Sequence, residues 1–304
     1  MIRVTFLGTA ASRPTVARNV SAIAVQREGD HFLFDCGEGT QRQMMRFGTG
    51  FSLSDIFITH VHADHYLGII GLLRTMGLQA REEPIRLWAP SGTRAVLEEA
   101  VHLGVERVPF PIEIRELGPD ERVERDGYDI VGFRTQHGIR SLGYALIEHD
   151  RLGRFDPDKA RALGVPEGPQ FGRLHRGEGV EVDGRRIDPA DVVGPARPGR
   201  RVVYTGDTLP TAETARVARD ADLLIHDATF DDEETERAGS TGHSTARQAG
   251  RLAAEAGAHR LVLTHISSRY SENAKRLERE ARAEFPSSAV AFDGMSLELQ
   301  YRDD

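Results

Sequence analysis

The chain has 304 residues, enough for one large domain with a substantial core. Hydrophobic residues make up 39%, and no apolar run reaches the roughly 18 residues of a membrane span, while a net charge of −8 taken alone argues against a nucleic-acid partner. The single cysteine, Cys36, excludes an internal disulfide and favours a cytoplasmic location.

Short strand-like runs dominate residues 1–150. The segments IRVTFLG, SAIAVQ and HFLFDCG predict successive strands of one sheet, and DIFIT (55–59) predicts another. The apolar stretch 66–78 is long enough for a buried helix. This half therefore mixes strands with at least one helix.

Residues 201–304 follow a strand–helix–strand rhythm. Strand-like RVVYTGD, LLIHDAT and RLVLTHI alternate with helical patterns near 211–219 and 245–256. Such alternation predicts a layered α/β fold.

Residues 151–201 differ from the rest, with nine glycines and six prolines. They carry 11 basic and 8 acidic residues, net +3, whereas the remainder carries 28 and 39, net −11. With few apolar residues together, we expect no separate core but an excursion from the domain. It is either a solvated loop or an arm that contacts a polyanion.

The segment THVHADH (59–65) places four ligand-type side chains just after a predicted strand. His60 lies at the strand's carboxyl end, where ligands of α/β sheets gather, and His62 can point the same way. Asp64 and His65 follow directly. Imidazole and carboxylate are the ligands of Zn²⁺ and similar divalent ions, so the cluster predicts a metal site.

A metal pair needs further ligands, and three residues repeat the pattern of a ligand type at a strand end. His31, His102, His149, His175 and His259 do not, and we assign them to the surface or to packing. Seven ligands suit two four-coordinate metals with a bridging carboxylate and hydroxide. The set is His60, His62, Asp64, His65, His137, Asp207 and His265.

The pattern HxHxDH with the later His, Asp and His resembles the metallo-β-lactamase superfamily. The resemblance implies a four-layer αββα sandwich of the α/β class. Members hydrolyse lactams, thioesters, lactones and phosphodiesters, so this signature leaves the reaction open.

Other segments resemble the ribonuclease Z family: FLGTAASRP, FDCGEGTQRQM (34–44), HDATF (226–230), GHST (242–245) and THISSRY (264–270). The resemblance implies one catalytic domain over 1–304 with a flexible tRNA-binding arm inserted at about 151–200. It implies a zinc-dependent hydrolase, an endoribonuclease that removes the 3′ trailer of tRNA precursors. The tRNA would keep a 3′-hydroxyl and the trailer a 5′-phosphate.

The resemblance also assigns the ligands. His60, His62 and His137 would hold one zinc, Asp64, His65 and His265 the other, and Asp207 would bridge them. Manganese or iron would accept the same ligands. Asp64 is then the expected orienting group or base for the attacking hydroxide.

His243 is the expected source of a proton for the leaving oxygen. It precedes a capping-box pattern, Thr245 to Gln248, that predicts a helix ending at Gly257. Asp227, where the family often has glutamate, would pair with His243, support a metal ligand or cap a turn. Asp35 and Glu38 would support ligands or form turns.

Three residues are expected RNA contacts besides the arm: Arg18, Asn19 and Arg269. Val16 stands where the family often has a basic residue in the loop associated with the CCA end, which puts discrimination against mature tRNA in doubt. The resemblance implies a homodimer in which one subunit's arm holds tRNA for the other, with no DNA or membrane partner.

Two alternatives compete with this function. A related hydrolase of small phosphodiesters or esters is disfavoured by the arm and the GHST segment. A non-catalytic RNA-binding module is disfavoured by the full ligand set, because structural zinc sites are usually single and closed.

Overall fold

The computed structural model describes residues 1–105 and 107–302. It divides into two compact units. The larger unit combines Met1–Ile147 with Arg200–Asp304, and the smaller unit is Glu148–Gly199. The expected domain span of 1–304 includes Glu106, Asp303 and Asp304, which lie outside the described residues.

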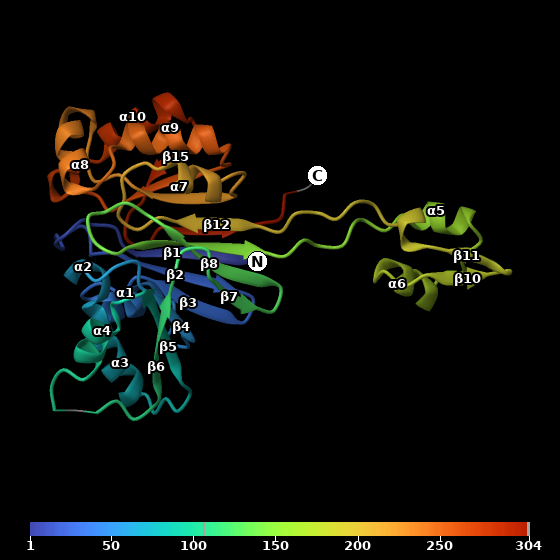
Figure 1. Cartoon of the computed structure of the whole chain (residues 1–304), viewed down its shortest axis with the longest axis horizontal. Coiled ribbons are helices and arrows are strands. Elements are labelled where there is room, and N and C mark those ends of the chain that lie inside the picture. The colour runs from blue at the N-terminus through green and yellow to red at the C-terminus, as the bar shows by residue number, and fades with distance from the viewer. Residues whose placement is uncertain (106, 303–304) are drawn as a thin grey trace. The chain divides into compact units, whose positions relative to one another are not determined.

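Two seven-stranded sheets form the middle of the larger unit (Figure 1). In the first sheet β3 to β6 run parallel, and in the second β12 to β15 do. The first sheet has the spatial order β16 (Ser296–Leu299), β1 (Ile2–Gly8), β2 (Ala22–Arg27), β3 (Asp30–Phe34), β4 (Asp55–Phe57), β5 (Ile85–Pro90), β6 (Ile112–Leu117). The second has the order β15 (Ser288–Val290), β14 (Leu261–Thr264), β13 (Leu223–Asp227), β12 (Arg201–Tyr204), β9 (Leu142–Glu148), β8 (Tyr128–Arg134), β7 (Arg122–Arg125).

Helices cover the outer face of each sheet. The predicted helix over 66–78 is α3, preceded by the short α2, and the predicted capping box of Thr245 and Gln248 starts α9. The first sheet is covered by α1 (Thr40–Phe47), α2 (Ala63–Tyr66), α3 (Gly68–Leu78) and α4 (Arg94–Val101). The second is covered by α7 (Ala212–Val217), α8 (Thr235–Thr241), α9 (Ala246–Ala256) and α10 (Lys275–Glu284).

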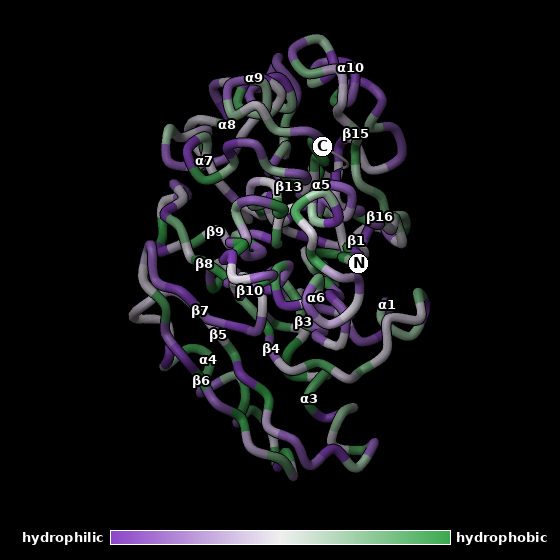
Figure 2. Tube along the Cα trace, turned by 90° about the vertical axis from the view of Figure 1, so that its right-hand side faces the viewer, coloured by the Kyte–Doolittle hydropathy of each residue, from purple (hydrophilic) through white to green (hydrophobic). Residues whose placement is uncertain are grey.

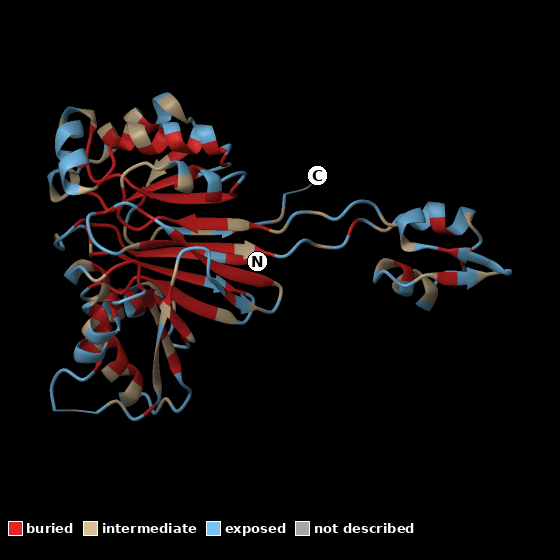
Figure 3. Ribbon diagram, in the orientation of Figure 1, coloured by how far each residue is buried: buried red, intermediate tan, exposed pale blue. Residues whose placement is uncertain are grey.

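Three apolar layers hold this unit together. Phe34 and Tyr144 stack in the layer between the sheets, with ring centroids 5.9 Å apart. Leu72 belongs to the layer under α3, and Leu252 to the layer under α9. Buried residues make up most of the central strands of the two large sheets in Figure 3, and many of these strands carry apolar residues in Figure 2. The predicted four-layer αββα sandwich is confirmed.

No helix of the described residues is long and apolar enough to cross a membrane.

The smaller unit has a core of its own, so the prediction that this segment lacks one is wrong. Six of its residues are buried together, among them Leu174 and Ile187. Each element contributes only one or two apolar side chains, which is why the sequence shows no apolar run. Its elements are α5 (Pro157–Ala162), α6 (Pro169–His175), β10 (Val180–Val182), β11 (Arg185–Ile187) and the 3₁₀ turn η1 (Pro189–Asp191).

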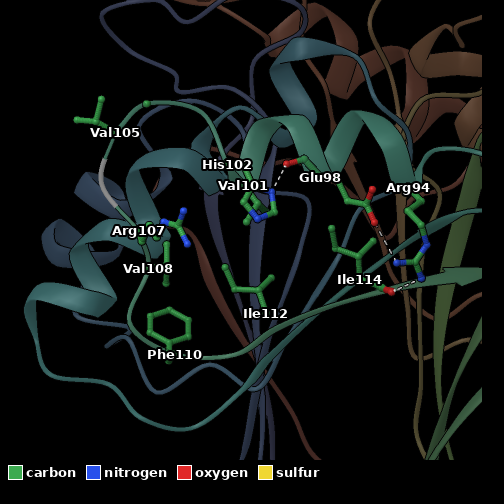
Figure 4. Close-up of a pocket in the computed structure, with 11 residues that line it drawn as sticks. Arg94, Glu98, Val101, His102, Val105, Arg107, Val108, Phe110, Ile112 and Ile114 are labelled. Atoms are coloured by element: carbon green, nitrogen blue, oxygen red, sulfur yellow. Dashed lines mark hydrogen bonds and ion pairs between the residues drawn. The ribbon is translucent and has the colours of Figure 1, made fainter.

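A groove of about 840 Å³ lies between α4 and the edge strand β6 (Figure 4). Val101, Ile112 and Ile114 line it, and Arg94 donates from Nη2 to the Ile114 carbonyl at 2.6 Å. This bond occupies a carbonyl of an edge strand that would otherwise be open to pairing. None of the candidate ligands lines the groove.

A buried carboxylate, Asp55, ties β4 to its neighbours. It accepts from Arg86 at 2.7 and 2.8 Å, from Trp88 at 2.7 Å and from Arg125 at 2.9 Å. Burial raises the pKa of Asp55, but the bonds from Arg86 and Trp88 outweigh it and hold the pKa below its usual value.

We expect Asp55→Asn to lower the free energy of unfolding by about 2–4 kcal/mol at pH 7, because two arginines lose their counter-ion. Since the folded pKa is depressed, this stabilisation is complete above the unfolded pKa of about 3.9 and is lost as pH falls through the folded value. Urea unfolding at pH 7 and below pH 4 checks it. The half-buried Glu113→Gln should shift the free energy by less than about 0.5 kcal/mol, and a gap for Asp55→Asn that stays undiminished as the pH falls below 4 would contradict the account.

Candidate metal centre

All seven candidate ligands lie close together, although they come from four segments of the chain. His60 follows β4, His137 follows β8, Asp207 follows β12 and His265 follows β14. His62, Asp64 and His65 lie at or within α2, whose start carries them back over the end of β4. The carboxyl ends of strands from both sheets therefore meet at one edge of the sandwich, as expected for α/β ligand sites.

One group of ligand atoms consists of three imidazoles and one carboxylate oxygen. His62 Nδ1 lies 3.0 Å from His60 Nε2 and 3.2 Å from His137 Nε2. Asp207 Oδ2 lies 3.7 Å from His60 Nε2 and 3.5 Å from His137 Nε2.

A second group uses the other oxygen of the same aspartate. Asp207 Oδ1 lies 3.3 Å from both His65 Nε2 and His265 Nε2. Asp64 Oδ2 lies 3.5 Å from His65 Nε2 and 3.3 Å from His265 Nε2. Asp207 thus presents one oxygen to each group, which is the geometry of a bridging carboxylate.

These separations fit metal ions. A tetrahedral ion with bonds of about 2.0–2.1 Å has ligand atoms about 3.3 Å apart, which is close to the spacing in both groups. Two of the atoms, His65 Nε2 and Asp207 Oδ1, are buried without a hydrogen-bond partner among the described residues. They lie 3.3 Å apart as an ion pair. Buried polar atoms without partners are rare, and a cation would satisfy both.

The charges of the site lead to the same conclusion. Burial lowers the pKa of His65, but Asp207, Asp35 and Asp64 outweigh it and hold the pKa well above its usual value. Burial raises the pKa of Asp207, but His265 and His65 hold it well below the usual range. Two buried carboxylates and the half-buried Asp64 therefore need positive charge, which a proton on His65 supplies in part and a divalent cation would supply more fully.

The second nitrogen of each buried imidazole is held by the protein. Thr59 Oγ1 lies 3.0 Å from His60 Nδ1, and Thr229 Oγ1 lies 2.9 Å from His265 Nδ1. His137 Nδ1 donates to the Gly242 carbonyl at 2.8 Å. Such contacts fix ring orientation and tautomer, as in known metal sites.

Asp35 takes both of the roles considered for it. Its φ of +56° shapes the turn after β3, and its carboxylate accepts from His65 Nδ1 at 2.8 Å and from Tyr204 Oη at 2.7 Å. Glu38 is exposed, and its backbone carbonyl accepts from Asn19 Nδ2 at 2.9 Å. The roles of Tyr204, Thr59 and Thr229 were not predicted; the only sequence signal is that Thr59 precedes a candidate ligand.

Asp227 and His243 form a pair beside the second group. Asp227 Oδ2 lies 2.8 Å from His243 Nδ1, while Asp227 Oδ1 accepts from Thr229 Oγ1 at 2.7 Å, and that hydroxyl also contacts His265. Asp227 therefore contacts His243 directly and a candidate ligand through one hydroxyl. Burial lowers the pKa of His243, but the Asp227 carboxylate outweighs it and raises the pKa to about 9.

The three expected RNA contacts lie in different environments. Arg18 is buried and donates to Thr9 Oγ1 at 2.7 Å and to the Ala291 carbonyl at 2.6 Å. We therefore interpret Arg18 as a structural residue that stabilises the loop between β1 and β2. Asn19 is half-buried, and the Arg269 side chain is 40% exposed near the site.

Comparison with known proteins identifies this centre. The Metallo-beta-lactamase superfamily matches residues 15–265, so the fold and the site are those of a metallo-β-lactamase-fold protein with a divalent metal cofactor. Ribonuclease Z of Myxococcus xanthus is 55% identical over 305 residues, covering 100% of this chain and 99% of the relative. Ribonuclease Z of Gemmatimonas aurantiaca is 58% identical and covers 97% of this chain and 95% of the relative. The chain belongs to the ribonuclease Z family.

Solved structures agree with this assignment. The crystal structure of the short form of human tRNase Z has a TM-score of 0.71 and 28% identity, covering 98% of this chain and 99% of that one. The protein YhfI of Bacillus subtilis has a TM-score of 0.70 at 19% identity and covers 97% of this chain and 98% of that one, a likeness that shows the fold alone.

Proposed function

We propose that this protein is a metal-dependent endoribonuclease that cuts tRNA precursors at the 3′ side and removes the 3′ trailer. The observation that carries the proposal is the two groups of ligands joined by Asp207, in a chain at least half identical to ribonuclease Z over its full length. This substrate also favours the cytoplasmic location predicted from the single cysteine.

We assign the seven ligands to two ions, taken as Zn²⁺ from the imidazole-rich donor set. His60, His62 and His137 would hold one ion, Asp64, His65 and His265 the other, and Asp207 both. When bound, the ions would lower the pKa of a water molecule towards neutrality and offset the charge of the phosphate.

Two side chains then handle the protons. Asp64, which accepts from the Ser12 amide at 2.7 Å, orients the attacking water and takes its proton. As the water oxygen bonds to phosphorus, the bond to the 3′-oxygen breaks, and His243 donates a proton to that oxygen from Nε2, because Nδ1 is held by Asp227. The tRNA leaves with a 3′-hydroxyl and the trailer with a 5′-phosphate.

One assay tests the substrate. The purified protein is incubated with a tRNA precursor bearing a 3′ trailer and, separately, with bis-p-nitrophenyl phosphate, with His62→Ala as control. We expect cleavage of the precursor that His62→Ala loses. Cleavage of the small ester alone would instead favour a small-phosphodiesterase, and RNA binding without cleavage would favour a binding module.

The smaller unit, residues 148–199, supplies the tRNA-binding arm in this proposal. Lys159 on α5 and Arg185 on β11 are exposed, and neither side chain makes an ion pair with the described residues. Arg161, in contrast, is paired with Asp158 and Glu167 at 2.5 Å. Unpaired cations are the ones free to contact phosphates.

Deleting residues 155–195 should raise KM for the precursor and flatten its dependence on salt, because phosphate contacts are lost. Lys159→Ala and Arg185→Ala should each lower the slope of log affinity against log salt by about 1, while Arg161→Ala should change it less. Cleavage assays at a series of salt concentrations check this. An unchanged slope after the deletion would contradict the arm's role.

We also propose a homodimer. Three apolar side chains are exposed: Val16, Met45 and Phe292. Their segments lie close together, because the Asp293 carboxylate accepts hydrogen bonds from the backbone amide of Asn19 and from the side chain of Gln43. Exposed apolar side chains gathered in this way are typical of protein interfaces.

Replacing both Met45 and Phe292 with glutamate should convert the dimer to a monomer. Each subunit would then bury two negative charges against those of its partner across the symmetric interface. Leu78→Glu, at the end of α3, should leave the dimer intact. Sedimentation equilibrium distinguishes these outcomes, and a wild-type monomer at micromolar concentration would refute the homodimer.

A further inference from the structure

Two arginines lie over one aromatic ring beside the site. Phe230 follows β13, and its ring centroid lies 6.1 Å from that of His243. The guanidinium carbon of Arg237 on α8 lies 5.8 Å from the Phe230 centroid, and that of Arg269 on the 3₁₀ turn η3 (Ser268–Tyr270) lies 5.9 Å from it. Both guanidinium groups thus lie over one ring on the His243 side of the centre.

Both arginines share one carboxylate. Glu234 lies 3.9 Å from Arg237 Nη1 and 3.5 Å from Arg269 Nη1, and all three side chains are between 33% and 52% exposed. These separations exceed those of a direct, charge-assisted hydrogen bond, which is about 2.7–2.9 Å. The pairs are therefore loose and open to solvent.

The neighbouring acids are engaged elsewhere. Asp232 pairs with Arg247 on α9, while Asp231 and Glu233 pair with Arg276 on α10 at 3.2 and 2.6 Å. In the acidic run 231–234, Glu234 is thus the acid that faces the two arginines.

We propose that Arg237 and Arg269 form a clamp for one backbone phosphate of the RNA next to the scissile phosphate, and that Glu234 occupies the clamp until RNA displaces it. The inference rests on the proposed endoribonuclease function and adds to it a subsite and a competing internal anion. Arginine forks suit phosphate as well as carboxylate, so one anion can replace the other.

A third arginine, Arg13, lies between this pair of arginines and Asp64. Arg13 donates from Nη2 to Ser268 Oγ at 3.3 Å, and its neighbour Ser12 holds the Asp64 carboxylate through its amide. The cations thus lie along the side of the centre where Asp64, His265 and His243 are found. A strand of RNA running along this side would meet positive charge before it reaches the ions.

The clamp predicts that replacing Glu234 and replacing either arginine change KM in opposite directions. Glu234→Gln removes the competing anion and should lower KM for the precursor by about threefold to tenfold. Arg237→Ala and Arg269→Ala should raise KM by about tenfold and lower the salt slope by about 1 each, because each loses a phosphate contact. A purely structural role for Glu234 predicts weaker binding after its replacement.

The experiment measures kcat and KM of the full chain for the precursor at several salt concentrations, with bis-p-nitrophenyl phosphate as a probe of the metal centre. Arg3→Ala is the matched control, because Arg3 also pairs with a glutamate, Glu298, at similar exposure but at the far end of β1. We expect each arginine variant of the clamp to lose at least fivefold more on the RNA than on the ester, and Arg3→Ala to lose on neither.

An unchanged or raised KM in Glu234→Gln would overturn the clamp, as would arginine variants that shift KM no more than Arg3→Ala does. In both cases a wild-type protein that still cuts the precursor leaves the proposed function standing. A wild-type protein that cuts no precursor would overturn that function itself and the clamp with it.

Discussion

Replacing Asp207 with alanine should remove both metal ions and almost all cleavage of the precursor. Its two oxygens lie 3.3 to 3.7 Å from four imidazole nitrogens, and it brings negative charge to both groups of ligands. We expect kcat to fall by more than the roughly 10²–10³-fold that loss of a single electrostatic donor costs.

Elemental analysis of the purified variant, together with its cleavage rate, checks this prediction. Asp222→Asn is the matched control, because Asp222 is also buried in the second sheet but lies just before β13, at the opposite end from Asp227. Asp222→Asn should keep full metal content and activity. An Asp207→Ala protein with two bound ions per chain would contradict the bridging role.

His243→Ala should lower kcat by about 10²–10⁴-fold while metal content stays unchanged, since a positioned proton donor contributes that much. Asp227→Asn should lose nearly as much, because it leaves His243 Nδ1 without its carboxylate. The double variant should be little worse than His243→Ala alone, as groups that act as a unit are not additive.

Single-turnover cleavage with excess protein separates this loss of kcat from weaker RNA binding. The control is His102→Ala, because His102 lies at the C-terminal end of helix α4 and is not a candidate ligand. A precursor whose leaving 3′-oxygen is replaced by sulfur needs no proton donor, so it should largely restore the rate of His243→Ala. If the sulfur substrate gives no recovery, His243 does not protonate the leaving group. Reduced metal content in Asp227→Asn would show that its contact with Thr229 and His265 dominates.

The positions of the candidate ligands follow from a simple pattern. His137, Asp207 and His265 each come one to three residues after the end of a strand, and strands that run in the same direction bring their carboxyl ends to one edge of a sheet. That reasoning needs no knowledge of which strands are neighbours. The structure brings together residues that are up to 205 positions apart, His60 and His265, as this pattern predicts for their positions.

Contacts that depend on three-dimensional neighbours had no such signal. Tyr204 reads as a core strand residue, yet its hydroxyl supports Asp35, which in turn holds His65. Arg18 reads as a surface cation, but it is buried against Thr9 and Ala291. In both cases the role depends on which backbone segment packs opposite, and the local pattern does not contain that information.

The core of the smaller unit could not be predicted from the local sequence pattern either. Its buried residues are spread one at a time over short elements between glycines and prolines, so neither a helical nor a strand period develops. Counting apolar residues in a sequence window therefore underestimates the ability of such a unit to form a core. Only the packing of α5 and α6 with the β10–β11 hairpin brings them together.

The most direct test of the central claim is to identify the ends that the protein makes on a tRNA precursor. Metal-free protein, protein reloaded with Zn²⁺ and the reloaded Asp207→Ala variant are each incubated with a precursor that carries a 3′ trailer, and both products are sequenced and their termini analysed. We predict one cut at the 3′ side of the tRNA by reloaded wild-type protein only, with a 3′-hydroxyl on the tRNA and a 5′-phosphate on the trailer. A cut by the metal-free protein or by the variant, or a phosphate left on the tRNA, would contradict the account.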